Sequence, residues 1–256
     1  MGVLDRFRLD GKVAVVTAGS KGIGRGIALA LAEAGADILI TARGRAALDE
    51  SCVAIEALGR RAVGLVADAT DAEAMRQVAE KAMAAFGHVD IWVNNAGGQP
   101  DGKVRPFLDV DAENFTAQVD LNLTSVWAGT RAAAPLLSEG GSIITISSVA
   151  SRRGLHANYA LYAALKSAIV SLTTSLAAEL APRLRVNAVA PSAIPTATFR
   201  ETMGVTEDTQ DSLLPHMGIP LGRWGAPEDV GAAVVYLASP AGAFVTGECL
   251  YVTGGM

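Results

Sequence analysis

The chain of 256 residues has little of what holds small secreted domains or structural metal sites together. It contains only two cysteines, Cys52 and Cys249, and three histidines, His88, His156 and His216. The cysteines stand far apart, and no ligand spacing links the histidines to them or to each other. Because disulfide frameworks and zinc sites need closely spaced Cys or His residues, we expect no disulfide, no metal site and a reducing compartment.

The sequence also lacks the features of nucleic-acid-binding and membrane proteins. Its 21 basic residues stand against 26 acidic ones, a net charge of −5, and no basic stripe is present to follow a phosphate backbone. It has no uninterrupted apolar run of about 18 residues, and residues 1–12 scatter charges where a secretory signal would be apolar. With half of its residues hydrophobic, the chain is expected to be a soluble, cytoplasmic, globular protein that binds neither nucleic acid nor membrane.

Short apolar runs alternate with longer segments of helical periodicity along the whole chain. The expected strands are residues 12–17, 37–42, 62–67, 90–93, 142–147, 185–190 and 248–252, and the expected helices are 22–34, 45–58, 71–86, 111–137, 158–180 and 227–237. Strands that are apolar on both faces and separated by helices are typical of a parallel sheet covered on both sides. No linker or repeat divides the chain. We therefore predict an α/β fold with one domain, residues 1–256, a doubly wound, Rossmann-like parallel sheet with helices on both faces.

A glycine-rich turn, TAGSKGIG at residues 17–24, joins the first strand to the first helix. Glycines let the chain turn tightly and let a pyrophosphate approach backbone N–H groups at the positive end of a helix. Such a turn alone is a weak indication, and an ordinary strand-to-helix connection is the alternative. Its place between a strand and a helix, in a chain that alternates between the two, favours dinucleotide binding.

Two basic residues flank the place where the adenosine ribose of such a cofactor would lie. The second strand ends at Ala42 and Arg43 instead of at the carboxylate that would bind a 2′-hydroxyl, and Lys21 lies in the glycine-rich turn. Because a 2′-phosphate requires cations, the pair favours NADP(H) over NAD(H). Each residue alone would equally fit a solvated surface position.

Further motifs follow in the same strand–loop–helix register. They are Asp68 after the third strand, NNAG at 94–97 after the fourth, Asn122 in the long helix, Ser147 and Ser148 at the end of the fifth strand, Tyr162 and Lys166 at the start of the next helix, RVNAVAPSAIPT at 185–196, and PED at 227–229. A Tyr–Lys pair four residues apart is common by chance, whereas all these pieces in order are not. On them the chain, from about Leu9 to its last residues, resembles the short-chain dehydrogenase/reductase family.

The resemblance implies an oxidoreductase that transfers a hydride between NADP(H) and a carbonyl or secondary alcohol. It makes Tyr162 the general acid/base and Lys166 the group that tunes it and binds the nicotinamide ribose. It also makes Ser148 the residue that orients the carbonyl and Asn122 the support of a water relay to Lys166. Tyr162 and Lys166 share a helix face, and a nearby ammonium is expected to lower a tyrosine pKa toward neutrality.

The resemblance also implies a set of cofactor contacts. They are Asp68 and Ala69 for adenine, Asn95, Ala96 and Gly97 for the adenosine ribose, Ile194 and Thr196 for the nicotinamide carboxamide, and Gly19, Ser20, Lys21, Gly22, Ile23, Gly24, Arg43, Tyr162, Lys166 and Pro191 for the rest of the cofactor. Asn94 and Asn95 also suit a structural role at a strand end. We favour binding for this asparagine pair without excluding the structural role.

The sequence departs from the family pattern in the turn and near the serine. Ala18 replaces the first glycine of the turn, so the backbone there is expected to suit a residue with a Cβ atom. The interval from Ser148 to Tyr162 is one residue longer than usual, and Ser147 would lengthen it further, so Ser148 is preferred while both serines stay open. With Ser192 in place of a glycine, these changes motivate an alternative, a cofactor-binding regulatory or scaffold protein with little turnover.

Three segments are expected to enclose the substrate, residues 98–107, 151–158 and 192–218. The last is long and contains methionines, which suits a mobile lid over a largely apolar pocket. His156 lies where a substrate contact is plausible. The resemblance extends to 3-oxoacyl-thioester reductases and to hydroxysteroid dehydrogenases, and likeness of fold does not choose between these substrates. The family also implies a homotetramer or dimer, for which the Ala-rich segments 132–134 and 177–178 would allow close helix approach.

Overall fold

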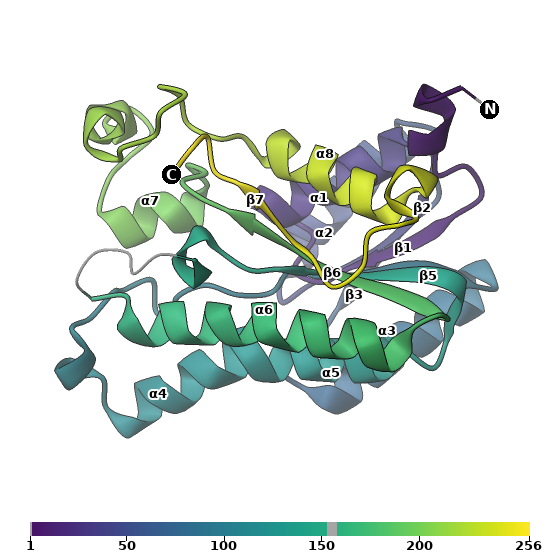
Figure 1. Cartoon of the computed structure of the whole chain (residues 1–256), viewed down its shortest axis with the longest axis horizontal. Coiled ribbons are helices and arrows are strands. Elements are labelled where there is room, and N and C mark those ends of the chain that lie inside the picture. The colour runs from purple at the N-terminus through teal and green to yellow at the C-terminus, as the bar shows by residue number, and fades with distance from the viewer. Residues whose placement is uncertain (1, 153–157) are drawn as a thin grey trace.

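The computed structural model describes residues 2–152 and 158–256, and it confirms the doubly wound α/β fold (Figure 1). Seven parallel strands pair in the order β3-β2-β1-β4-β5-β6-β7. The strands are β1 (Val13–Val16), β2 (Asp37–Ala42), β3 (Ala62–Val66), β4 (Val89–Asn94), β5 (Leu137–Ile146), β6 (Leu184–Pro191) and β7 (Cys249–Val252). The order reverses between β1 and β4, which places a crevice for a ligand at the carboxyl ends of those strands.

Helices cover both faces of the sheet (Figure 1). They are α1 (Gly22–Glu33), α2 (Arg45–Glu56), α3 (Ala72–Phe86), α4 (Ala112–Val119), α5 (Ser125–Ala133), α6 (Ala160–Leu180), α7 (Ala197–Met203) and α8 (Pro227–Ala238). One face carries α1, α2 and α8, and the other carries α3, α5 and α6. Asp71 accepts hydrogen bonds from two backbone N–H groups at the start of α3, the N-cap that its position in the sequence predicts.

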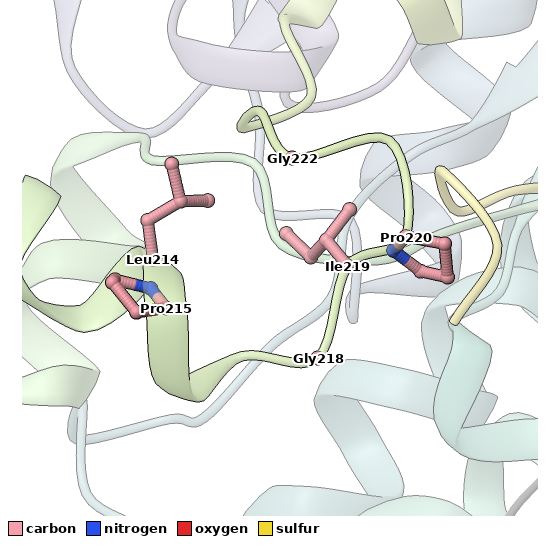
Figure 2. Close-up of a pocket in the computed structure, with 6 residues that line it drawn as sticks. All are labelled: Leu214, Pro215, Gly218, Ile219, Pro220 and Gly222. Atoms are coloured by element: carbon pink, nitrogen blue, oxygen red, sulfur yellow. The ribbon is translucent and has the colours of Figure 1, made fainter.

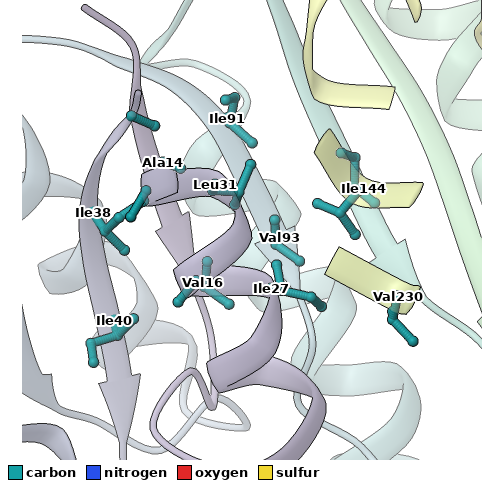
Figure 3. Packing of buried hydrophobic residues seen from close by; sticks show 14 of the residues in the cluster. Ala14, Val16, Ile27, Leu31, Ile38, Ile40, Ile91, Val93, Ile144 and Val230 are labelled. Carbon is teal, nitrogen blue, oxygen red and sulfur yellow. The ribbon is translucent and has the colours of Figure 1, made fainter. Parts of the chain in front are cut away.

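Two apolar clusters fill the space between the sheet and its helices. Figure 3 shows the first, in which Ile27 and Leu31 of α1 and Val230 of α8 pack on strand residues such as Val16 and Ile144. The second cluster lies under α3, α5 and α6 and includes the fully buried Trp92. Alternate residues of each strand enter opposite clusters, which explains why the strands are apolar throughout.

The expected long helix 111–137 is interrupted in the structure. A π-helical turn, Asp120–Thr124, separates α4 from α5, and Asn122 lies in it. The helix ends at Ala133: Ala134 keeps helical backbone angles, but Pro135 has no N–H to donate to the next intrahelical hydrogen bond. Leu137 already belongs to β5, where it pairs with Val89, so the predicted helix was too long at this end.

Helix α6 is long and apolar enough to cross a membrane, with 21 residues and a mean hydropathy of 1.3. It packs on the sheet through buried residues that include Lys166, Ile169 and Thr173. Its apolar face is therefore partly buried in the core of an α/β fold.

The turn between β1 and α1 carries backbone strain at Ala18. The φ angle of Ala18 is +50°, in the left-handed region that favours glycine, which contradicts the expectation that this backbone suits a Cβ atom. At the neighbouring Gly19 a Cβ would lie 2.6 Å from the Ile40 side chain, so this position of the turn requires glycine.

Replacing Ala18 with Gly is therefore expected to stabilise the protein. The left-handed backbone costs an L-residue about 1–2 kcal/mol, which glycine avoids. Against this gain, glycine increases the entropy of the unfolded chain and so lowers the free energy of unfolding by about 0.4–1 kcal/mol. The free energy of unfolding should rise by up to about 1 kcal/mol, which thermal or urea denaturation measures. The matched control Ala84→Gly, at an exposed position of α3, should lower it by about 1 kcal/mol. A lower stability of Ala18→Gly would contradict the strain.

Candidate active site

The predicted site residues come together at the carboxyl ends of neighbouring strands. The register pairs Val16 of β1 with Val93 of β4, Asn94 with Thr145 of β5, and Ile146 with Val189 of β6. The loops that follow these strands therefore leave the sheet at the same edge. Helix α7 and the segment after it lie at this end of the molecule (Figure 1).

Tyr162, Lys166 and Ser148 form one cluster there. Lys166 Nζ lies 5.6 Å from the centroid of the Tyr162 ring and donates to the Ile146 carbonyl at 3.1 Å. The Ser148 side chain is hydrogen-bonded to the Tyr162 hydroxyl. Ser147 points away from this cluster, since its Oγ donates to the Lys166 carbonyl at 2.9 Å and its side chain is buried. Of the two serines that the sequence left open, the structure places Ser148 beside the tyrosine.

Burial sets the protonation of this cluster. It raises the pKa of Tyr162 to about 12, although the hydrogen bond from Ser148 opposes the rise. It lowers the pKa of Lys166 to about 8, because the ammonium has lost most of its water. Desolvation thus raises the pKa of Tyr162, the opposite direction to the lowering that was expected from the nearby Lys166. Tyr162 is protonated at neutral pH.

Asn122 reaches the same cluster from the π-helical turn. Its side chain is fully buried and makes two hydrogen bonds of 2.9 Å with the backbone of Gly98. A Cβ on the preceding Gly97 would lie 2.8 Å from Lys166 Nζ and 3.2 Å from Asn122 Oδ1. The amide oxygen and the ammonium therefore face the same point of the backbone, close enough for one water to bridge them.

The glycine-rich turn is tied to the loop after β4 by Asn95. The Asn95 amide donates to the carbonyls of Thr17 and Ala18 at 3.0 and 3.1 Å. A Cβ on Gly24 would collide with the Ala18 carbonyl and the Asn95 amide, so only glycine fits at this position. On its other side the turn meets the loop after β6, where a Cβ on Gly22 would lie 3.0 Å from Thr196.

Asn94 is a structural residue. It is buried in β4, where Oδ1 accepts from Trp92 Nε1 at 2.9 Å and Nδ2 donates to Thr130 at 2.9 Å. These bonds lock the sheet to α5. The structural alternative therefore holds for Asn94, whereas Asn95 lines the crevice edge.

The other predicted cofactor residues surround the same crevice. Asp68 is exposed, and Thr70 holds its carboxylate through two hydrogen bonds that lower the pKa of this group. Arg43 is exposed and adds to that lowering. Ser20 in the turn is buried and Ile23 in α1 is half-buried. The remaining ones, Ala69, Ala96, Pro191 and Ile194, are buried at strand ends or in the loops after them.

A cavity of about 550 Å³ opens beside the glycine-rich turn. Lys21 lines it together with two further cations, Arg25 of α1 and Arg200 of α7, and with Glu50 of α2. Sequence reasoning did not select Arg25 or Arg200. The position of Arg25, directly after the last glycine of the turn, was the available signal.

The expected lid 192–218 has secondary structure of its own. Thr196 caps α7, and a 3-10 helix spans Gln210–His216. Behind that helix lies an apolar cavity of about 480 Å³ (Figure 2), bounded by Leu214, Pro215, Ile219 and Pro220. Tyr159, whose ring meets that of Tyr162 edge-on, contacts Met203 at the end of α7, so the segment touches the catalytic cluster. His156 lies outside the described residues.

Within residues 2–152 and 158–256, no group of three or more His, Cys, Asp or Glu side chains converges in a way that could hold a metal ion.

Known proteins are similar to this chain over nearly its whole length. Residues 17–256 match the family described as enoyl-(acyl carrier protein) reductase. An uncharacterised oxidoreductase of Mycobacterium tuberculosis is 42% identical over 257 residues, 99% of this chain and 95% of the relative. The 3-oxoacyl-[acyl-carrier-protein] reductase FabG of Escherichia coli is 38% identical over 98% of this chain and 99% of its own.

Solved structures agree with the sequence matches. A 7α-hydroxysteroid dehydrogenase in complex with NADH and 7-oxo glycochenodeoxycholic acid superposes with a TM-score of 0.89 at 34% identity, covering the whole chain and 98% of its own. A short-chain dehydrogenase of Burkholderia cenocepacia in complex with NADP has a TM-score of 0.87 at 36% identity over 97% of this chain and 98% of its own. The chain belongs to the short-chain dehydrogenase/reductase family and is an NAD(P)-dependent oxidoreductase that acts on CH–OH groups.

Proposed function

We propose that this protein is a cytoplasmic NADPH-dependent carbonyl reductase whose substrate is a ketone or a 3-oxoacyl compound. The observation that carries the proposal is the cluster of Ser148, Tyr162 and Lys166, with Asn122 facing Lys166 across Gly97. The substrate class is supported by the relatives, which include a 3-oxoacyl reductase and a dehydrogenase crystallised with a 7-oxo steroid.

The crevice fits a nicotinamide dinucleotide. Gly22, Gly24 and Gly97 pack closely against Thr196, Ala18 and Lys166, so the turn and the loops after β4 and β6 approach one another where the pyrophosphate and nicotinamide of such a cofactor would bind. Lys21, at the end of the turn, and Arg43, directly after β2, are both exposed, and we assign them to the 2′-phosphate. Bound NADPH would supply the hydride for the carbonyl carbon.

The side chains of the cluster supply the proton. Ser148 would hold the carbonyl oxygen by a hydrogen bond, and Tyr162, protonated at neutral pH, would donate its proton to that oxygen as the alcohol forms. Lys166, with a pKa of about 8, is the group in the cluster best suited to return a proton to the tyrosine. Asn122 would hold the water that connects Lys166 to solvent. These assignments favour reduction at neutral pH, because oxidation requires the phenolate.

We also propose that the protein assembles as a homotetramer or a dimer. The outer side of α6 exposes small residues such as Ala164, Ser167 and Ser171, and Trp127 of α5 is 46% exposed. Such faces suit helix packing between subunits. The Ala-rich segments 132–134 and 177–178 were expected to allow close approach of helices between subunits. Ala133 and Ala177 of these segments are instead buried in the core of the subunit.

Replacing Tyr162 with Phe tests the proton donor. The variant should lose about 10²- to 10⁴-fold in kcat on a ketone that the wild type reduces, while its affinity for NADPH stays near that of the wild type. Tyr159→Phe, at the neighbouring ring, is the matched control and should lose far less. Near-normal turnover of Tyr162→Phe would show that the donor is assigned wrongly. A wild type that binds NADPH but reduces no ketone or oxoacyl thioester would favour the scaffold alternative.

Cofactor choice is tested by fluorescence titration with NADPH and, separately, NADH. Because a charged hydrogen bond contributes about 1.5–3 kcal/mol, Lys21→Ala and Arg43→Asp should each weaken NADPH binding by about 10- to 100-fold and NADH binding much less. Arg45→Asp, which breaks a surface pair with Asp49, is the control. Equal losses for both cofactors would remove the phosphate assignment.

The buried ammonium of Lys166 predicts how stability depends on pH. The pKa of this group is about 8 in the folded protein against 10.5 for a solvated lysine, so between these values the unfolded chain binds more protons. The free energy of unfolding should therefore rise from pH 8 to pH 10, by about 2 kcal/mol more in the wild type than in Lys166→Met. The pKa of Tyr162 is raised from 10 to about 12, so this residue lowers the free energy of unfolding with rising pH only above pH 10. Urea unfolding at both pH values measures the difference, and identical pH dependence in the two proteins would contradict the burial of the charge.

A further inference from the structure

The orientation of the Asn122 amide is dictated by one backbone residue. The Gly98 N–H donates to Asn122 Oδ1 and the Gly98 carbonyl accepts from Asn122 Nδ2, each at 2.9 Å. A peptide N–H only donates and a carbonyl only accepts, so the side-chain amide has a single possible orientation.

This constraint passes from Asn122 to two glutamines. The second hydrogen of Asn122 Nδ2 points to Gln118, whose backbone carbonyl and Oε1 lie 3.0 and 3.2 Å away. Oε1 must therefore face Asn122, which turns Gln118 Nε2 toward Gln99, and Nε2 donates to Gln99 Oε1. The three amides form a chain with one polarity, from the Gly98 backbone to Gln99.

The middle of this chain is shielded from water. Asn122 is 0% and Gln118 5% exposed, so neither amide has bulk solvent to replace a lost partner. Gln99 is half-buried and lies in residues 98–107, one of the segments expected to enclose the substrate. Gln118 lies one helical turn before Asn122, at the end of α4.

We propose that Gln118 is a positioning residue for Asn122, and that Gln99 couples this pair to the loop over the substrate. The inference rests on the proposed function, in which Asn122 serves the proton relay to Lys166. Gly98 sets which end of the Asn122 amide carries the oxygen, and Gln118, which accepts the remaining Nδ2 hydrogen, restrains the position of that amide beside the point it shares with Lys166. Movement of the loop at Gln99 is then transmitted to the relay through two hydrogen bonds.

A double-mutant cycle on turnover tests the coupling. Gln118→Leu should lower kcat by about tenfold with a smaller change in KM, and should shift the pH profile of kcat/KM in the same direction as Asn122→Ala. In the Asn122→Ala background, Gln118→Leu should have no further effect on kcat. Losses that multiply in the double variant would overturn the proposal. Gln77→Leu, the same change on the exposed face of α3, is the control for a general effect on the protein.

The link to the loop is tested by two substitutions at Gln99. Gln99→Glu keeps an oxygen that accepts from Gln118 Nε2, whereas Gln99→Leu does not. The glutamate variant should therefore retain several-fold more kcat than the leucine variant, and equal losses would remove Gln99 from the chain.

Crystal structures of the variants supply a readout that needs no substrate. The Asn122 amide should change its orientation or its distance to Gly98 in Gln118→Leu, and to a smaller extent in Gln99→Leu. An unchanged amide in Gln118→Leu would overturn the positioning role. If the wild type reduced no carbonyl compound, the proposed function would fail while these structures still decided whether Gln118 holds Asn122.

Discussion

The ammonium group of Lys166 is buried, and its need for hydrogen-bond partners and space determines how the surrounding site is built. A buried charge needs partners, and Lys166 finds one in the Ile146 carbonyl at the last residue of β5. The helix that carries it is held against the same strand end by the bond from Ser147 to the Lys166 carbonyl. A Cβ on Gly97 would lie only 2.8 Å from Nζ, so a side chain there would displace the ammonium. Strand β5, helix α6 and the loop after β4 thus meet at a single nitrogen atom.

The same burial explains why Tyr162 and Lys166 have different roles in the proposed proton transfer. Desolvation raises the pKa of the phenol and lowers that of the ammonium, so the two pKa values move apart and proton transfer from the Lys166 ammonium to a Tyr162 phenolate becomes more favourable. A tyrosine that keeps its proton at neutral pH suits donation to a carbonyl oxygen. Ser148, hydrogen-bonded to the same hydroxyl, provides the second polar contact for that oxygen in the proposed reaction.

Much of the fold could be predicted because its signals are local. Apolar runs, helical periodicity and the cap at Asp71 located nearly every strand and helix, and the ordered motifs indicated the family. The errors have physical causes that neighbours in sequence do not reveal. The helix 111–137 was predicted as continuous, whereas a π-helical turn displaces Asn122 toward Gly98. The backbone at Ala18 was expected to suit a Cβ, whereas it adopts a positive φ in the turn between β1 and α1.

The amino-acid sequence by itself determined the layered α/β architecture, the glycine-rich turn and the residue types available for proton and hydride transfer, because these depend on periodicity and on the spacing of motifs. Only the tertiary structure decided which of two adjacent serines faces Tyr162, that Asn94 is structural, and that Gln118 and Gln99 contact Asn122. It also reversed the expected direction of the tyrosine pKa. The reason is that hydrogen-bond partners and the loss of water depend on groups brought together by the sheet, and these groups are distant along the chain.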